Sequence, residues 1–584
     1  MGVSKLQELI DQIPSLCKEV KVEKTGLIID GNALYYSLYF HCDLELDQRC
    51  GGDYPGFKDE VCNFFKTLKD CKVTPYVILD GVPDPDKHET LVSRRKDKQE
   101  KAKTIAETKP KDAIPKGCNV LPPLVKDVFI EILKEKGIEF KQCLGEADPE
   151  VVFAANQKQC AVLSNDTDFC IYDVNKGFIH LKHFEWKKEE NGKIPAKLYT
   201  RSKFCEYFEL DPALMPVFAS IAGNDYSRLG KEIFAKESPL PGEYNIKRLH
   251  GMLTFLSEVK LDSLNDAQKR EHALKDAVNH VRENEDRSFK LSIQKYVEPE
   301  NPTSNLPLWV RKKIQFGELG YFVTSMEDFS QPNCKAARHI RQYYALLIGD
   351  KMCTEYDRDH KTDVQPLLPN VNSDEQEQLQ LQRLHEAPEG LRRRVFEEAL
   401  QVQTSALENI PDQLKLPVCV TVFWFKRLQH HPKPETVHCL HALLLGFVFN
   451  PNSPEDEFER KMKALKDEGV RQELQPRVAH AFIQWLCCMR QSLHLNQLLC
   501  SPLPEPQCAR LYCGSRLHWL ADEDAIEELQ KTLRGKKKKL YKVLKTTVHH
   551  LSGKGFPTPS VLRGPLVGKG GRQSKRAHGQ SKSR

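Results

Sequence analysis

The chain has 584 residues, of which 40% are hydrophobic and 29% charged, enough for several domains with real cores. Its net charge is +6, but 16 of the 87 Lys and Arg residues follow residue 530, where no acid occurs, so the first 530 residues carry 71 basic and 81 acidic groups. No apolar run approaches the roughly 20 residues of a membrane span and the charged N-terminus lacks a signal-peptide pattern, so we expect a soluble intracellular protein.

The 19 cysteines are scattered along the chain, which favours reduced thiols rather than a disulfide framework. Cys500, Cys508, Cys513 and His518 could form a zinc site, but they contain no Cys-x-x-Cys pair. Buried free cysteine is the favoured interpretation.

Two apolar segments near the N-terminus each end in an aspartate followed by glycine. Residues 25–30 lead to Asp30-Gly31 and residues 75–80 lead to Asp80-Gly81, with an amphipathic helix predicted between them over 57–68. This order predicts two parallel strands joined by a crossover helix. A turn that merely uses Asp-Gly would explain one such segment, but the repeat favours acids placed at one sheet edge.

Residues 84–118 follow the second strand and are dense in basic side chains: Arg94, Arg95, Lys96, Lys98, Lys101 and Lys103. Such a charge run is by default a solvated helix or loop. Its position directly after Asp80 predicts a lid over the acidic edge, with cations available for a phosphodiester.

Residues 142–173 hold two pairs of carboxylates, Glu146 with Asp148 and Asp166 with Asp168. The first pair opens a predicted helix over 148–157, and the second follows a predicted buried strand over 161–163. Either pair alone would be more simply a turn or a helix cap. Together with Asp30 and Asp80 they would repel one another strongly unless divalent cations bound to their oxygens.

The second half of the chain is less informative. Residues 236–530 are predicted to be mostly helical, with a linker near 361–378. Residues 338–347 combine bases with aromatics, as a strand-binding surface would, although a helix with a Tyr-Leu core face is favoured. Residues 531–584 form a basic tail that we expect to be largely disordered, and its lysines at 536–539, 542 and 545 indicate a nuclear localisation signal or a nucleic-acid patch.

Five motifs occur in the order and approximate spacing of the flap endonuclease superfamily, whose members are nucleases with a PIN-like domain: Asp30-Gly31, Asp80-Gly81-x-Pro83, Glu146-Ala147-Asp148, Asn165-Asp166-x-Asp168 and Gly223-Asn224-Asp225-Tyr226. The start at Gly2 is similar as well, and the overall layout most resembles the asteroid family. The resemblance implies an α/β fold: a PIN-like domain over 1–235 with a mainly parallel sheet and helices on both faces, a mostly α-helical region, then the disordered tail.

The same resemblance implies a site for two Mg²⁺ or Mn²⁺ ions. Its ligands would be seven carboxylates: Asp30, Asp80, Glu146 and Asp148 mainly at one ion, and Asp166, Asp168 and Asp225 at the other. Lys87 and Arg94 match two catalytic basic residues that contact the scissile phosphate. Tyr36 matches an aromatic that stacks on a terminal base, and a core aromatic is an equal alternative for it.

The function that the resemblance implies is structure-specific endonuclease activity on DNA with single-stranded portions, such as overhangs and flaps, in DNA repair. RNA stays open as a substrate, and so do the repair-protein partners. The basic tail predicts a nuclear location, with the cytoplasm left open. Residues 227–233 lack the glycine pattern with which relatives grip duplex DNA, so duplex binding and polarity are not carried over. Two alternatives remain: a non-catalytic scaffold in receptor tyrosine kinase (EGF receptor) signalling, and a DNA-binding adaptor that acts through the tail.

Overall fold

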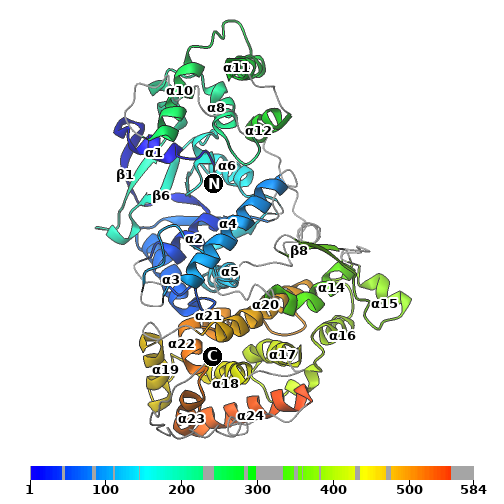
Figure 1. The fold of residues 1–584 in the computed structure, drawn as a ribbon. Coiled ribbons are helices and arrows are strands. Elements are labelled where there is room, and N and C mark those ends of the chain that lie inside the picture. Colours follow the sequence, from blue (N-terminus) through cyan, green and yellow to red (C-terminus); the bar gives the residue numbers. More distant parts are fainter. Residues whose placement is uncertain are drawn as a thin grey trace, which may run out of the picture.

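The computed structural model describes residues 2–42, 46–81, 87–109, 112–143, 145–227, 234, 243–281, 287–297, 333–347, 353–357, 360–380, 383–427, 434–468 and 475–553. The molecule has two parts, a layered α/β part up to residue 297 and a helical part from residue 333 (Figure 1). Among these residues no helix is both long and apolar enough to cross a membrane.

A sheet of seven strands forms the centre of the first part, in the order β1-β7-β6-β5-β2-β3-β4. The strands are Cys17–Val22 (β1), Gly26–Asp30 (β2), Thr74–Leu79 (β3), Glu139–Gln142 (β4), Ala161–Ser164 (β5), Phe178–Phe184 (β6) and Ile194–Tyr199 (β7). Strand β2 is parallel to β3 and β5, β3 to β4, and β5 to β6, whereas β7 is antiparallel to β1 and β6. The expected mainly parallel sheet is confirmed.

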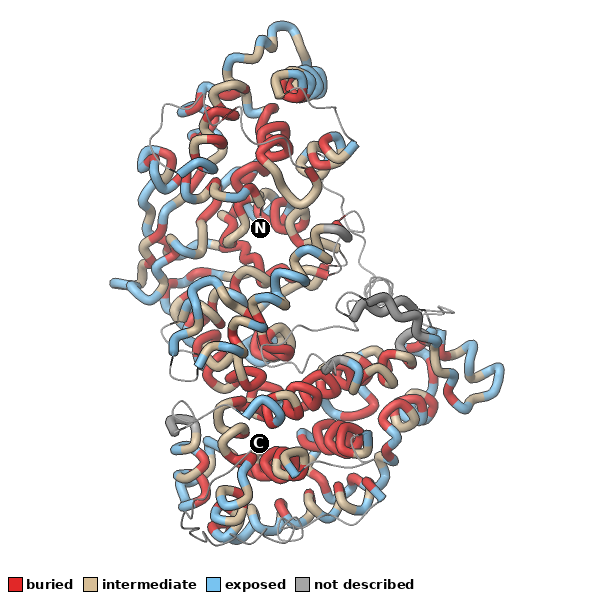
Figure 2. The backbone as a smooth tube through the Cα atoms, viewed as in Figure 1, coloured by how far each residue is buried: buried red, intermediate tan, exposed pale blue. Residues whose placement is uncertain are grey.

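The central strands are buried on both faces, which explains their nearly continuous apolar sequences. In β2, Leu27 and Ile29 belong to one core and Ile28 to the other, because successive side chains of a strand point to opposite faces. Figure 2 shows this burial along the centre of the α/β part.

Helices cover both faces of the sheet, as expected. The first core contains side chains from α2 (Gly31–Phe40), α3 (Tyr54–Asp70) and α5 (Val125–Lys136). The second contains side chains from α1 (Leu6–Asp11), α6 (Asp148–Lys158), α7 (Arg201–Tyr207), α8 (Met215–Ala222), α10 (Tyr244–Ser257), α11 (Asp266–Val281) and α12 (Arg287–Val297). Helices α10, α11 and α12, which lie in the region predicted to be mostly helical from residue 236, pack on α8 of the α/β part.

The second part is a helical bundle. Its helices are α14 (Arg338–Leu347), α15 (Ser373–Gln378), α16 (Glu389–Leu400), α17 (Asp412–Arg427), α18 (Pro434–Val448), α19 (Glu457–Glu468), α20 (Pro476–Leu498), α21 (Cys508–Leu511), α22 (Gly514–Leu520), α23 (Glu523–Thr532) and α24 (Gly535–Ser552), and a hairpin pairs β8 (Cys353–Asp357) with β9 (His360–Val364). The predicted linker over 361–378 thus contains β9 and α15. In α14, Ile340, Arg341, Tyr343 and Leu347 are buried, in agreement with a helix that has a core face.

The bundle shares a continuous core with the first face of the sheet. At the junction, the Tyr512 hydroxyl donates to the carbonyl oxygen of Cys50 (2.5 Å) and the Gly514 N–H to that of Gly52 (2.7 Å). Gly514 is required there, because a Cβ atom would lie 2.4 Å from the Cys50 oxygen. The two parts are therefore joined by packing and not only by a linker.

The prediction of a disordered tail from residue 531 is wrong for its first part. Helix α24 packs on α17 and α18, and Tyr541, Leu544 and Val548 are buried at helical spacing. Tyr541 Oη also lies 3.0 Å from His441 Nδ1. This apolar face was hidden in the sequence by the lysines around it, and residues 554–584 lie outside the described part.

Candidate active site

Asp30 and Asp80 lie side by side because β2 and β3 are parallel neighbours that end at the same edge. Asp30 caps α2, since its Oδ1 accepts hydrogen bonds from the N–H groups of Asn32 (3.0 Å) and Ala33 (3.1 Å). Asn32 Nδ2 in turn donates to Asp80 Oδ2 at 2.6 Å. One turn after β2 therefore holds both carboxylates.

The second pair of acids follows β5, the other parallel neighbour of β2. Ser164 connects the two strand ends: its hydroxyl donates to Asp30 Oδ2 (2.6 Å) and accepts from the N–H of Asp166 (3.0 Å). Asp166 then accepts a hydrogen bond from the N–H of Asp168 at 3.0 Å. This turn directs two carboxylates to the same edge.

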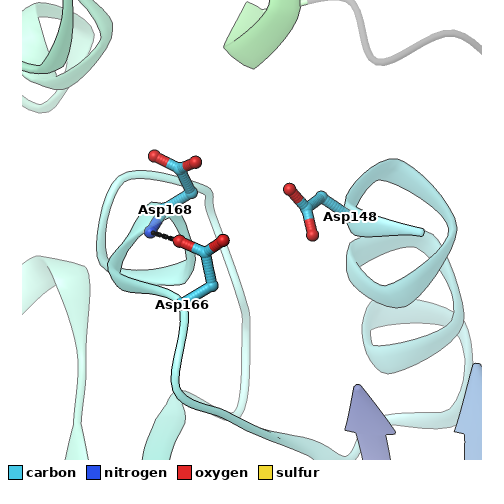
Figure 3. A group of neighbouring side chains, drawn as sticks. All are labelled: Asp148, Asp166 and Asp168. Atoms are coloured by element: carbon cyan, nitrogen blue, oxygen red, sulfur yellow. Dashed lines mark hydrogen bonds between the residues drawn. The ribbon is translucent and has the colours of Figure 1, made fainter. Parts of the chain in front are cut away.

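Asp148, Asp166 and Asp168 form a cluster in which one oxygen from each lies within 4.8 Å of the others. Figure 3 shows Asp148, at the start of α6, facing the Asp166–Asp168 turn. No described residue donates a hydrogen bond to the Asp148 carboxylate. Three partly buried carboxylates with such spacing suit a hard divalent cation such as Mg²⁺ or Mn²⁺. Asp148, which the resemblance assigns mainly to the ion of Asp30, Asp80 and Glu146, thus also lies within reach of Asp166 and Asp168.

Three acids of this edge, Asp30, Asp148 and Asp168, resist ionisation when no cation is bound. Burial, and then the charge of Asp80, raise the pKa of Asp30 to about 6. Burial and Asp166 raise the pKa of Asp168 to about 7, and burial and Asp166 raise the pKa of Asp148 well above its ordinary range. Bound cations would remove this penalty, which is the electrostatic reason to expect metal here.

The raised pKa of Asp168 predicts how stability depends on pH. Its folded pKa of about 7 lies above the ordinary value of 3.8. Between about pH 4 and 7 the unfolded chain has therefore released a proton that the folded state still binds, so the stability of the fold decreases as pH rises through this range. Asn cannot ionise, so we expect Asp168→Asn to stabilise the metal-free protein by about 1–3 kcal/mol at pH 8 and by less at pH 5. Urea unfolding in EDTA at both pH values measures the gain, and an equal gain at both would contradict the assignment.

The lid contributes two cations to the same edge. Helix α4 spans His88–Glu107, and Lys87 is its N-cap residue. Lys87 Nζ lies 2.6 Å from Glu146 Oε2 and 3.1 Å from Asp225 Oδ2, and the guanidinium of Arg94 forms an ion pair with Asp225. Burial alone would lower the pKa of Lys87, but the Glu146 carboxylate in particular raises it above its ordinary value. Both basic residues singled out in the sequence thus face the acids.

The far end of α4 is held by other elements. Ala102 and Ile105 pack on Val120, and Ala106 packs on the bundle helix α20 at Ala479 and Ile483. The lid therefore spans from the acidic edge to the bundle.

Tyr36 lies in α2 and is 37% exposed, next to the ring of Phe40 at a centroid distance of 4.8 Å. It is therefore not a core aromatic.

Residues 228–233, most of the stretch without the expected glycine pattern, lie outside the described part. Among the described residues, Cys500, Cys508, Cys513 and His518 belong to no group of side chains that could hold a metal ion, so the zinc hypothesis gains no support.

Sequence reasoning missed several residues of the site. Asn32 follows the strand that ends in Asp30, and Ser164 ends the strand that precedes Asp166. Their positions at the ends of these strands were the only sequence signal for either residue. Lys126 of α5 donates to the carbonyl oxygen of Asp80 (2.7 Å), and Tyr296 of α12 donates to Asp168 Oδ1 (2.5 Å). Neither has a sequence signal, because each comes from a helix far along the chain from its partner.

Comparison with known proteins agrees with this architecture. Residues 1–101 match the family model of the XPG N-terminal domain, and residues 455–557 match that of the Asteroid N-terminal domain. The first match covers the part of the chain that carries Asp30 and Asp80, so these two strand-end carboxylates lie in a domain of the XPG N-terminal class.

The match to relatives extends over most of the chain. The mouse protein named single-strand DNA endonuclease ASTE1 is 32% identical over 599 residues, which cover 90% of this chain and 86% of the relative. The Drosophila protein asteroid is 27% identical over 322 residues, covering 45% of this chain and 37% of the relative. This chain belongs to the asteroid family.

A solved structure, the catalytic core of Rad2 in complex with DNA substrate, aligns at 14% identity with a TM-score of 0.30, covering 53% of this chain and 93% of that chain. A likeness at this level is too weak to assign a function.

Proposed function

We propose that this protein is a divalent-metal-dependent endonuclease that hydrolyses phosphodiester bonds in DNA with a single-stranded portion, and that it acts in DNA repair. The observation that carries the proposal is the carboxylate cluster of Asp148, Asp166 and Asp168 at a sheet edge that also receives Lys87 and Arg94 of the lid. The ASTE1 relatives are named single-strand DNA endonucleases, which supports single-stranded DNA as the substrate.

In this proposal, seven acids hold two Mg²⁺ or Mn²⁺ ions: Asp30, Asp80, Glu146, Asp148, Asp166, Asp168 and Asp225. When bound, such ions supply a nucleophilic water at neutral pH and stabilise the oxygen that leaves phosphorus. Asn32 and Ser164 hold the first two strand-end carboxylates in place, so these ligands need little rearrangement.

Lys87 and Arg94 act on the substrate in this mechanism. Each now pairs with a carboxylate, and each would exchange it for a non-bridging oxygen of the scissile phosphate, where negative charge accumulates in the transition state. The exchange is favourable once cations neutralise Glu146 and Asp225. Tyr36, exposed on α2, is available to stack on a base of the strand.

The test is direct. The full-length protein is incubated with labelled single strands, flaps, overhangs, duplexes and a matched RNA strand, with Mg²⁺, with Mn²⁺ or with EDTA. We expect cleavage of DNA that has a single-stranded portion, and only with metal. Absence of cleavage of all DNA substrates with either ion would overturn the proposal in favour of the scaffold function, which no specific observation at present favours.

We also propose that the protein enters the nucleus and that the exposed lysines of α24 carry the signal. Lys537 is not one of them, because it pairs with Asp456 and Glu459 at 2.8 Å each. The exposed lysines are Lys536, Lys538, Lys539 and Lys542.

Replacing these four lysines by Gln should reduce nuclear accumulation of a fluorescent fusion in cells. Deletion of residues 531–584 is an unsuitable test, because it removes the buried face of α24 and would destabilise the bundle. The control variant replaces Lys96, Lys98, Lys101 and Lys103 of α4 by Gln and so loses the same number of positive charges elsewhere on the protein. A quadruple α24 variant that still concentrates in nuclei would contradict the assignment.

A further inference from the structure

Helix α12 (Arg287–Val297) reaches the acidic edge although no sequence motif pointed to it. The hydroxyl of Tyr296 lies 2.5 Å from Asp168 Oδ1. Because an ionised carboxylate can only accept, the phenol is the donor in this hydrogen bond. A hydrogen-bond donor at this distance fixes the rotation of the carboxylate.

The same helix also holds the loop that carries Asp225. Asn224 Nδ2 donates to Ser292 Oγ (2.7 Å) and to Tyr296 Oη (3.3 Å). Asn224 Oδ1 accepts from the N–H groups of Tyr226 (2.9 Å) and Ser227 (3.1 Å), which fixes the turn around Asp225.

The network has one consistent direction of donation. Ser220 Oγ donates to the Pro216 carbonyl oxygen (2.8 Å), so its contact with the buried Ser292 hydroxyl (2.7 Å) must have Ser292 as the donor. Ser292 then accepts from Asn224, and Tyr296 accepts from Asn224 while it donates to Asp168. Accepting one hydrogen bond strengthens the one that a hydroxyl donates. Helix α12 thus connects α8, the Asp225 loop and Asp168.

We propose that Tyr296 is a positioning residue of the metal site: its hydroxyl, anchored by Asn224 of the Asp225 loop, holds the side chain of Asp168 oriented beside Asp148 and Asp166. The proposal rests on the proposed function, because it assumes that these carboxylates bind a divalent cation. Partners of this kind typically change metal affinity or activity 10–100-fold when they are removed.

The competing explanation is that Tyr296 only fills space. Its ring lies beside that of Tyr172, with centroids 5.1 Å apart. Tyr172 provides a matched control, since its hydroxyl is directed to the backbone oxygen of Lys295 at 3.4 Å and not to a carboxylate. Tyr296→Phe and Tyr172→Phe each remove one hydroxyl from the same ring pair and keep the rings.

Mn²⁺ titration of the full-length protein without DNA, followed by the electron paramagnetic resonance signal of free Mn²⁺, tests the proposal. We expect Tyr296→Phe to weaken Mn²⁺ binding by about 10–100-fold and Tyr172→Phe to change it by less than about threefold. Thermal unfolding in EDTA verifies that both variants are folded.

Each other outcome has a definite meaning. Equal Mn²⁺ affinity of Tyr296→Phe and wild type, or equal weakening by both substitutions, would overturn the positioning role and leave the proposed function intact. A wild-type protein that binds no Mn²⁺ would overturn the metal site, and with it both the proposed function and this inference.

Discussion

Asp148→Asn should abolish metal-dependent DNA cleavage and at the same time make the metal-free protein more stable. The loss of rate should be at least about 10³-fold, because bound metal supplies several kcal/mol of transition-state stabilisation and about 1.4 kcal/mol is a tenfold change in rate. The gain in stability follows because ionised Asp148 is partly buried beside Asp166 and receives no hydrogen bond from a described residue. Asparagine keeps the shape of the side chain without its charge.

Two measurements examine this variant. Single-turnover cleavage of a labelled single strand gives the rate, and thermal unfolding with EDTA or Mg²⁺ gives stability. Mg²⁺ should raise the melting temperature of the wild type but have little effect on Asp148→Asn. Asp173→Asn, a change at a carboxylate that is 70% exposed and paired with Arg201, is the control and should behave as wild type. Wild-type cleavage by Asp148→Asn would contradict the site.

Arg94→Ala should slow single-turnover cleavage by about 10²-fold or more, the scale of losing a donor to the transition state. The guanidinium of Arg94 reaches Asp225 at the acidic edge, so it is placed to contact a phosphate bound there. Asp225 still keeps its ion pair with Lys87 at 3.1 Å in this variant, so the fold of the edge should survive.

Lys98→Ala is the matched control for charge. Lys98 is exposed one helical turn farther along α4, so its loss should mainly raise the dissociation constant for DNA, with an effect that fades at high salt. Single-turnover rates at saturating enzyme remove this difference in binding. If both variants lost only binding, to the same extent, the lid would be a basic surface without a role in chemistry.

The local pattern of the chain was sufficient to predict the acid-bearing edge. Asp30, Asp80, Asp166 and Asp168 each follow a short apolar strand, and strand polarity alone puts such residues at one edge when the strands are parallel. The amphipathic helix predicted over 57–68 is also local in origin, and it corresponds to α3, whose N-cap residue Asp53 accepts a hydrogen bond from the N–H of Gly56.

Contacts between distant segments had no such signal. Lys87 and Glu146 are 59 residues apart, and Tyr296 and Asp168 are 128 apart. A pair of this kind depends on how whole helices pack, which the periodicity of either segment does not specify. The grouping of Asp148 with Asp166 and Asp168 is of the same kind, since it follows from the position of α6 across β2 and β5.

Helix α24 shows the limit most clearly. Its lysines suggested a solvated tail, because charge density dominates any short window of that sequence. Tyr541, Leu544 and Val548 nevertheless form an apolar stripe, and the stripe is buried only because α17 and α18 present a matching surface. Composition and periodicity therefore established the sheet, its acidic edge and the basic lid. Long-range packing determined which side chains meet at that edge, because burial depends on a partner surface that a local sequence does not contain.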